Sequence, residues 1–513
     1  MTSNIAAQVI AFAASMVDRI VLVGILLRAW GPDVFSDFAV LQSAAQLVTI
    51  GELGMQLYFI NVMQSAHVNG DRELFRRLSS IHLGVILTIV GALGCVVLGF
   101  GAFGDVGFLV NITHIEPVSA LRIFILYACG NLLGIVRSTT TTIYIAAGDF
   151  AVSILVGACI LMASTCVSVL VALAGGDALA LAVVYFSCTG VLGLAYVQWD
   201  TRRRYPWRLG APALPSYREL VDAARHVKWF ALQILAPAVW LQLPVLILNA
   251  WKVSGHELTS FLLLRTMVNQ IRLIFQFAAV GTGIEIATHA HRGELERAWR
   301  LSAVVGVLTT VLCAVSAAGI VAFGPIVTLY WTGDPTLFSQ GMALLMLAPM
   351  LLVAPLQQPT SMLQFANMTL APGLQRLLQI ALGPVLCLAG QYAAGAMGLV
   401  AGLAIAEVIA FWSVVSLIAR IEFFTGFARY AAVSLVVGAA AFAWSVFAGD
   451  ILMAAYASTG IVAMGIKAGA WLTITAAPLG YMCLPKPMRA RLLNASRSIW
   501  SPALRRFTRG KSS

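Results

Sequence analysis

Charge is scarce in this sequence. Only 10% of its 513 residues are Asp, Glu, Lys or Arg, whereas 60% are hydrophobic and the mean hydropathy is +0.90. A water-soluble domain carries about 25% charged residues, so this composition indicates a polytopic membrane protein. Acidic residues are scarcer than basic ones: 21 Asp and Glu against 32 Lys and Arg give a net charge of +11.

The usual motifs of enzymes and ATP-driven pumps are also missing. The eight cysteines lie in apolar stretches without a C-x-x-C pair, which favours packing residues over metal or redox sites. The only Gly-Lys-Ser, at 510–512, has Arg505 where a Walker A motif needs its first glycine. The nearest approach to a metal cluster is Glu285, His289 and His291, at the edge of a basic loop. We therefore expect no metal, no cofactor and no enzymatic activity.

Long apolar runs occupy most of the chain. They are continuous rather than alternating, which favours helices over a β-barrel because a helix satisfies its own backbone hydrogen bonds in lipid. At about 20 residues per crossing, the sequence predicts an all-α fold of about fourteen transmembrane helices. They lie near residues 5–28, 38–62, 81–103, 119–143, 151–173, 179–199, 228–251, 258–287, 301–323, 338–365, 375–392, 396–419, 429–448 and 457–483.

The loops between these runs differ in charge. Alternate loops and the C-terminal tail hold 24 of the 32 Lys and Arg residues. Cytoplasmic loops carry such an excess, so we predict both termini in the cytoplasm, an inner (plasma) membrane location and contact with anionic lipids, without a nucleic-acid partner. The first residues, 1–8, lack the basic region of a cleavable signal peptide, so the first helix is expected to stay in the mature protein.

A polar stripe runs through the run at 258–286. Arg265, Asn269, Arg272 and Gln276 follow one another at spacings that place them on one face of a helix. An arginine at the bilayer centre costs about 2.5–3.5 kcal/mol on insertion scales. Two on one face therefore indicate a wet, protein-lined cavity for an anionic ligand.

An internal repeat organises the chain. The segment 70–79 recurs at 293–302, with Gly, two acids, Arg and Leu-Ser in matching places. The same offset carries Gln42 and Gln46 onto Arg265 and Asn269. Because each half holds an even number of helices, we expect two six-helix lobes related by a parallel pseudo-repeat, with the substrate between them. The expected domains are the N-lobe 1–200, a cytoplasmic linker 201–227, the C-lobe 228–425, two extra helices 426–485 and a basic cytoplasmic tail 486–513.

Two motifs carry a resemblance to a known family. Leu27–Phe38 leads into the second helix, Ile50–Met55 lies within it, and a basic loop follows. With these segments the sequence resembles the polysaccharide-transporter branch of the multidrug/oligosaccharidyl-lipid/polysaccharide (MOP) superfamily, the Wzx-like flippases. The resemblance implies translocation of undecaprenyl-diphosphate-linked oligosaccharide across the inner membrane by alternating access, for O-antigen, lipopolysaccharide or exopolysaccharide biosynthesis. Polysaccharide polymerase and export machinery are implied as partners.

The resemblance also implies a set of site residues. Related flippases place arginines from helices 1, 2 and 8 in a central cationic cavity, and Arg19 and Arg265 match this pattern. The second helix departs from it, because it carries Glu52 and no internal arginine. Guanidinium groups suit a lipid diphosphate because they donate forked, charge-assisted hydrogen bonds and stay protonated. The expected headgroup contacts are Arg19, Arg265, Arg272, Asn269, Gln276, Gln42 and Gln46. The alternative is that these arginines only pair with buried acids.

Three acids within the spans are candidates for ion coupling: Asp18, Glu52 and Glu407. A buried carboxylate can change its protonation as a cavity opens to each side of the membrane. Lys467 offers Glu407 a partner, which would make both residues structural.

Other polar residues suit sugars. Gln233, Trp240 and Gln242 mark the seventh predicted helix, and amides and an aromatic ring match sugar hydroxyls and faces, although helix packing uses the same residues. Prolines in the spans 228–251 and 338–365 predict kinks that are either hinges or static.

Three other functions remain open. A MATE-like cation exporter needs an acidic, aromatic site, which the arginine stripe disfavours. A lipid II flippase shares the cationic cavity. A membrane glycan polymerase or glycosyltransferase is expected to carry a large extracytoplasmic loop, and the longest such segment here is short, near 104–118.

Overall fold

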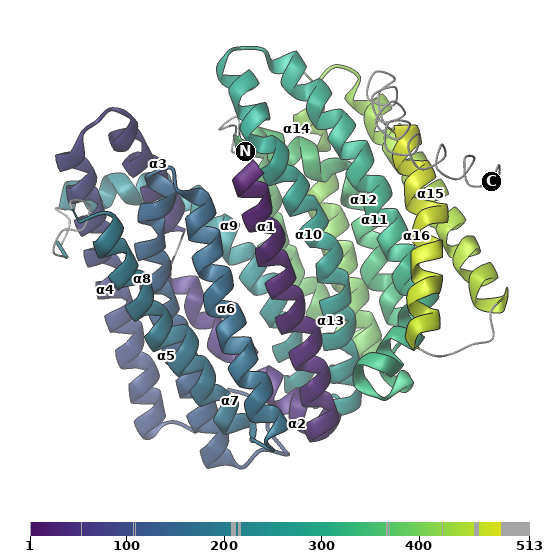
Figure 1. Cartoon of the computed structure of the whole chain (residues 1–513), viewed down its shortest axis with the longest axis horizontal. Helices are drawn as coiled ribbons and strands as arrows, with labels where there is room; N and C mark the ends of the chain where they lie inside the picture. The colour runs from purple at the N-terminus through teal and green to yellow at the C-terminus, as the bar shows by residue number, and fades with distance from the viewer. Residues whose placement is uncertain are drawn as a thin grey trace, which may run out of the picture. The chain divides into compact units, whose positions relative to one another are not determined.

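The protein consists mainly of long helices (Figure 1). The computed structural model describes residues 2–483 apart from 53, 106, 108, 207–211, 214–216, 366, 367, 369, 423 and 456–460. This part is helical and contains no strand. Ten of its helical stretches are long and apolar enough to cross a membrane. The protein is therefore a multi-pass membrane protein of the all-α class, as its composition predicts.

Two of these stretches hold two crossings each. Ala6–Glu52 turns back at Gly31, whose φ is 77°, and Leu370–Ala419 turns at Ala394 and Gly395. The helices α10 (Gly255–His291) and α16 (Ile461–Cys483) add two more of sufficient length to cross. Counted in this way, the described helices account for the fourteen predicted spans.

The described helices fall into two compact units. The first unit comprises residues 1–267, 325–346 and 372–413. It includes α1 (Thr2–Met16), α2 (Val23–Gln46), α3 (Met55–Val68), α4 (Arg72–Phe103), α5 (Pro117–Ala146), α6 (Phe150–Leu173), α7 (Ala178–Val184), α8 (Gly193–Arg204), α9 (Tyr217–Ala250), the start of α10 and most of α13 (Leu370–Trp412).

Helix α5 is the centre of the N-terminal part of the first unit. It packs against α2, α3, α4, α6 and α8, while α1 lies along α6. Its buried face is apolar except for a run of threonines, whose hydroxyls donate back to carbonyls of their own helix, as Thr139 does to Ile135. These internal hydrogen bonds let threonine lie in an apolar interior without leaving a donor unpaired.

The second unit comprises residues 268–324, 347–371 and 414–513, where the structure describes them. It contains the rest of α10, most of α11 (Leu295–Thr332), part of α12 (Gln340–Phe365), α14 (Val415–Ala419), α15 (Phe427–Ala455) and α16. The prolines of α12 do not interrupt it, although kinks or interruptions were among the expectations for this helix.

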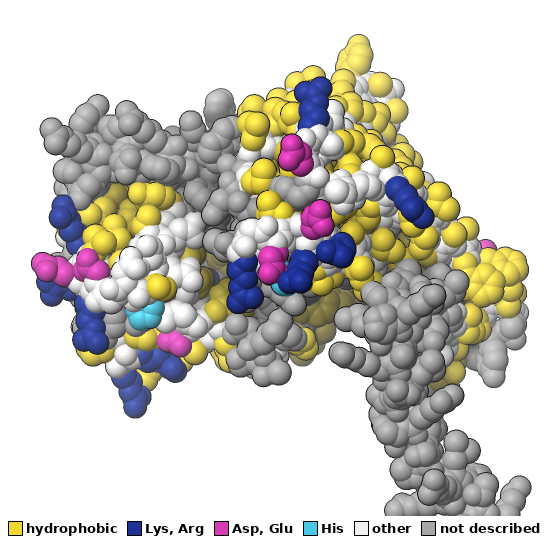
Figure 2. Space-filling model, turned by 90° about the horizontal axis from the view of Figure 1, so that it is seen from above, with side chains coloured by type: hydrophobic (Ala, Val, Ile, Leu, Met, Phe, Trp, Pro, Cys, Tyr) yellow, Lys and Arg dark blue, Asp and Glu magenta, His cyan; other side chains and the backbone are white. Residues whose placement is uncertain are grey.

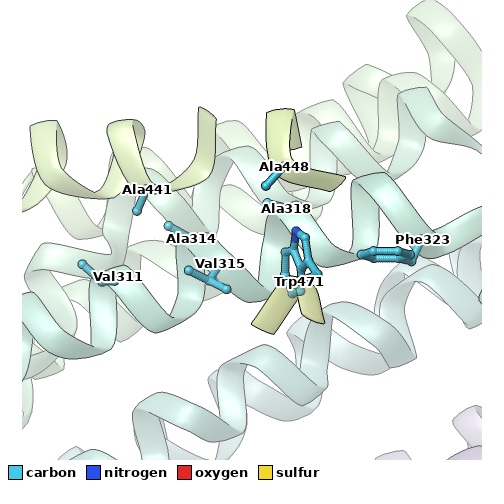
Figure 3. Packing of buried hydrophobic residues seen from close by; sticks show 8 residues of the cluster. All are labelled: Val311, Ala314, Val315, Ala318, Phe323, Ala441, Ala448 and Trp471. Atoms are coloured by element: carbon cyan, nitrogen blue, oxygen red, sulfur yellow. The ribbon is translucent and has the colours of Figure 1, made fainter. Parts of the chain in front are cut away.

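Helices α15 and α16, which fall outside the sequence repeat, pack on α11 through an apolar cluster (Figure 3). Trp471 of α16 lies at its centre, edge-on to the ring of Phe323 at 5.5 Å, and its indole N–H donates to the carbonyl of Ser445 at 2.8 Å. Small residues of α11 and α15 leave room for the indole. The extra helices are therefore integral to the core of the second unit.

The repeated motif adopts the same turn in both copies. Gly70 and Gly293 have φ of 73° and 76°, a left-handed conformation that glycine adopts without strain. The next residue donates its N–H five residues back, from Asp71 to Ala66 at 3.0 Å and from Glu294 to His289 at 2.9 Å. The sequence match thus reflects a shared helix-ending turn. The six-helix lobes inferred from it remain a prediction.

Figure 2 views the molecule from above relative to Figure 1, and Lys and Arg side chains stand out on this face among a few Asp and Glu. Asp71 caps α4 by accepting from the N–H of Leu74 at 2.8 Å. The predicted loop 63–80 is largely helical, because α3 ends at Val68 and α4 begins at Arg72. Assignment of this basic face to the cytoplasm remains a prediction.

Candidate functional site: a cationic site beside α9

Helix α9 brings predicted site residues together within the first unit. Arg265 donates from Nη1 to the backbone carbonyl of Leu241. The next residue, Gln242, is buried and donates from Nε2 to Oε1 of Gln46 on α2 at 2.9 Å. Pro244 has no N–H, so α9 lacks one backbone hydrogen bond in the same turn. One turn of α9 thus joins the polar stripe of α10 to that of α2.

The site carries net positive charge. Arg265 is half-buried, and its guanidinium lies 5.9 Å from the centre of the Phe261 ring. Arg19 is close enough for the two like charges to interact. Within the described part of the chain, no carboxylate forms an ion pair with Arg265. The charge of Asp18 acts on Arg19. Two guanidinium groups and one carboxylate still leave a net positive charge, which favours an anionic ligand.

The other predicted headgroup contacts are distributed as follows. Gln42 is exposed on α2, one turn before Gln46, which is also exposed. Asn269 and Arg272 are half-buried on α10 and belong to the second unit. Gln276 lies on the same helix, and its side chain is outside the described residues. The structure therefore groups Arg19, Arg265 and Gln46, and a common site with Asn269, Arg272 and Gln276 stays a prediction.

Arg19 and Asp18 lie on a distorted part of their helix. Residues Val17–Leu22 form a π-helical segment between α1 and α2. A π-segment widens the helix and frees carbonyls, and such segments often occur at functional sites. The carbonyl of Ile20 accepts the indole N–H of Trp331 at 2.5 Å, and Asp18 accepts a hydrogen bond from Thr165 on α6 at 2.7 Å.

A second π-helical segment, Tyr185–Leu192, packs against α6, as Val17–Leu22 does. Tyr185 stacks on Tyr127 at 4.6 Å and donates from its hydroxyl to Asn131 at 2.7 Å, and the charge of Asp18 acts on both tyrosines. Arg137 donates to the freed carbonyl of Thr189 at 2.6 Å. Asp18 therefore lies within electrostatic reach of the Tyr127–Tyr185 pair inside the N-terminal helices.

Glu52 lies at a break in the second predicted helix. The span expected over 38–62 is not continuous: a 3-10 segment, Leu47–Glu52, follows α2, and Gly54 has a left-handed φ of 72° before α3 begins. Oε1 of Glu52 is buried and has no hydrogen-bond partner. Broken helices inside membranes are typical of ion and substrate sites in transporters. The signal that sequence reasoning underused is Gly51 and Gly54, three residues apart inside an apolar run.

The third acid, Glu407, is 2% exposed on α13, and Lys467 is 5% exposed on α16. They belong to the first and second units respectively, so their pairing stays a prediction.

The basic loop near His289 is held by an ion-pair cluster. His289 Nδ1 lies 2.8 Å from Oε2 of Glu294, which also accepts from Arg297 at 3.0 Å. These hydrogen bonds hold the pKa of Glu294 below its ordinary value. The side chains of Glu285 and His291 lie outside the described residues, and the described part contains no group of three possible metal ligands.

Comparison with known proteins locates this fold. No family model matches the chain, and no curated protein matches it. Among solved structures, the lipid II flippase MurJ in an inward closed conformation has a TM-score of 0.65 at 9% identity and covers 98% of this chain and 100% of its own. An inward-facing multidrug resistance MATE transporter of the MOP superfamily has a TM-score of 0.60 at 12% identity, covering 83% and 98%.

This chain has the fold of MOP-superfamily transporters. A third neighbour, the MATE multidrug transporter DinF-BH, has a TM-score of 0.58 at 13% identity and covers 82% of this chain and 95% of its own. The MOP fold was expected from the motifs around residues 27–38 and 50–55, and it is confirmed. Identities this low show the fold and not the branch, so membership of the polysaccharide-transporter branch stays a prediction.

Proposed function

We propose that this protein is a flippase that moves a polyprenyl-diphosphate-linked oligosaccharide across the inner membrane for surface polysaccharide biosynthesis. The headgroup enters from the cytoplasmic leaflet while the polyprenyl tail stays in lipid. Arg19, Arg265 and Arg272 draw in the diphosphate, with Asn269, Gln276, Gln42 and Gln46 as further contacts. Alternating access then exposes the headgroup outside, where polymerase and export machinery receive it.

The observation that carries this proposal is the pair Arg19 and Arg265. Their charges interact, and the hydrogen-bond partner of Arg265 is the neutral carbonyl of Leu241. Two like charges that lie near each other in a membrane-spanning region repel, and an anion bound to both relieves that repulsion. A lipid diphosphate supplies several anionic oxygens in the reach of both groups, and forked guanidinium donors match such oxygens.

Coupling to protons or sodium is assigned to the acids in the spans. Asp18 accepts a hydrogen bond from Thr165, and Glu52 lies at a broken helix, where its buried Oε1 has no hydrogen-bond partner. Either carboxylate can take up a cation in one conformation and release it in the other. Glu407 is the remaining candidate.

Two transporter alternatives share the fold. A lipid II flippase is favoured over a cation exporter by coverage, because MurJ aligns with 98% of this chain and the two MATE structures with 83% and 82%. The positive charge of the site also disfavours an organic cation as the substrate, because like charges repel. A glycan polymerase or glycosyltransferase would need catalytic residues outside the membrane, and the described loop between α4 and α5 is short.

The test is complementation of a flippase-deficient bacterium, with surface polysaccharide as the readout at matched membrane abundance. Wild type restores the polysaccharide, and Arg265→Ala and Arg272→Ala lose it at least in large part. Arg300→Ala is the control, because Arg300 is exposed in the basic loop region of α11.

Each other outcome has a defined meaning. If both arginine variants restore polysaccharide as well as wild type, the arginines are structural and the anionic site is refuted. If wild type fails while it restores growth of a strain depleted of its lipid II flippase, the cargo is lipid II.

A further inference from the structure

A polar and aromatic seam joins α9 to α13 within the first unit. Gln233 and Trp240 lie two turns apart on one face of α9. The facing part of α13 carries Gln375, Gln379 and Gly383, at spacings of four residues. A Cβ atom on Gly383 would lie 3.3 Å from the indole of Trp240, so the ring packs directly on the helix backbone.

Arg376 ties the two helices together. Its Nε donates to Oε1 of Gln233 at 3.3 Å, and its Nη1 donates to Oε1 of Gln379 at 2.8 Å. Gln379 is only 4% exposed. A guanidinium and two amides thus meet a tryptophan ring along one helix interface, in a segment whose composition is otherwise strongly apolar.

Gln375 is the unexplained member of the seam. It is fully buried, with 0% exposure, and neither its Oε1 nor its Nε2 has a hydrogen-bond partner. A buried amide without partners costs free energy that leucine at the same position would not. Packing between α9 and α13 therefore does not account for a glutamine here, whereas a polar ligand present in another conformation does.

We infer that this seam is the sugar subsite of the flippase, which binds the first sugars of the headgroup when α9 and α13 move apart. Sugars are recognised by aromatic rings against their C–H faces and by amide or guanidinium groups at their hydroxyls. This inference rests on the proposed function. The two sites adjoin, because Arg265 contacts the carbonyl of Leu241, the residue next to Trp240.

The test separates the sugar from the diphosphate. Purified full-length protein in lipid nanodiscs is titrated with polyprenyl diphosphate, and with the same lipid bearing one to five sugars, by native mass spectrometry. We expect Trp240→Leu and Gln379→Leu to weaken binding of the glycosylated lipid by about tenfold and to leave the bare lipid diphosphate unchanged. Arg265→Ala weakens both.

Gln375→Leu distinguishes a ligand contact from a structural role. It removes a buried amide without partners, so it raises the melting temperature while it weakens binding of the glycosylated lipid. Gln391→Leu is the matched control, because Gln391 is a buried amide near the other end of the same arm of α13. Trp199→Leu, at an exposed tryptophan of α8, is the control for the loss of an aromatic ring.

Several results would overturn the subsite. If Gln375→Leu is stabilised and binds the glycosylated lipid as tightly as wild type, the seam is structural. Equal loss of both lipids in Trp240→Leu and Gln379→Leu also refutes a sugar subsite. Failure of wild type to bind either lipid refutes the proposed function itself, and with it this inference.

Discussion

At the scale of single residues, the buried carboxylate of Asp37 is held by hydrogen bonds from three backbone N–H groups. Asp37 of α2 is 4% exposed, and its Oδ2 accepts the N–H groups of Thr113, His114 and Ile115 at 3.1, 2.6 and 3.3 Å. Three N–H donors stabilise the negative charge of a buried carboxylate without a cationic partner. This clamp fixes the loop before α5, and the sequence offered no signal for it, because donors from the backbone leave no residue pattern.

Asp37→Ala should destabilise the protein by about 1–3 kcal/mol, because it leaves buried N–H groups without an acceptor. Thermal unfolding in detergent measures the loss, and Asp33→Ala, at an exposed position of the same helix, serves as the control. An equal melting temperature for Asp37→Ala and wild type would show that water replaces the carboxylate.

Glu294 gives a pH-dependent prediction. Hydrogen bonds from His289 and Arg297 lower its pKa from the ordinary 4.5. A carboxyl group with a lowered pKa stabilises the fold above its ordinary pKa, and the contribution is lost as the pH falls through the lowered value. Glu294→Gln should therefore lower the melting temperature slightly at pH 7. The difference should shrink as the pH falls below 4.5 and vanish once the pH is below the lowered pKa of Glu294. Glu296→Gln, at an exposed site of α11, is the matched control.

At the scale of elements, interrupted helices position the site. The π-helical segment Val17–Leu22 holds Asp18 and Arg19, and the break at Leu47–Glu52 holds Glu52. Periodicity predicted both helices but not their distortions, because an inserted residue or a 3-10 turn leaves an apolar run apolar. Packing against neighbouring helices determines where a helix can be distorted in this way.

The two arms of α13 make a prediction about close packing. A Cβ atom on Gly398 would lie 2.0 Å from the carbonyl oxygen of Gly390 across the turn. Small residues let membrane helices approach this closely. Gly398→Ala should cost about 1–3 kcal/mol, because the backbone it meets cannot rotate away.

Thermal unfolding of Gly398→Ala in detergent measures this cost. Gly157→Ala on α6 is the control, since its Cβ would meet open space and alanine favours the helix. A Gly398→Ala protein as stable as Gly157→Ala would mean that the arms separate readily.

At the scale of the whole molecule, the distribution of basic loops predicts orientation. In a background without the eight cysteines, Asn69→Cys and Asp105→Cys place single thiols at exposed positions near opposite ends of α4. We expect a membrane-impermeant maleimide to label Asp105→Cys in intact cells and Asn69→Cys only after permeabilisation. The reverse pattern would invert the topology and place the basic loops outside.

The sequence by itself determined the membrane class and the helical fold, and it showed the repeat of 70–79 at 293–302, because each follows from local composition and spacing. It also singled out Arg265 and Gln46. Only the tertiary structure decided that α9 connects them through Leu241 and Gln242. It likewise revealed the seam of Arg376 with Gln233 and Gln379. Residues more than a hundred positions apart meet there through helix packing, and no periodicity within either helix encodes its partner.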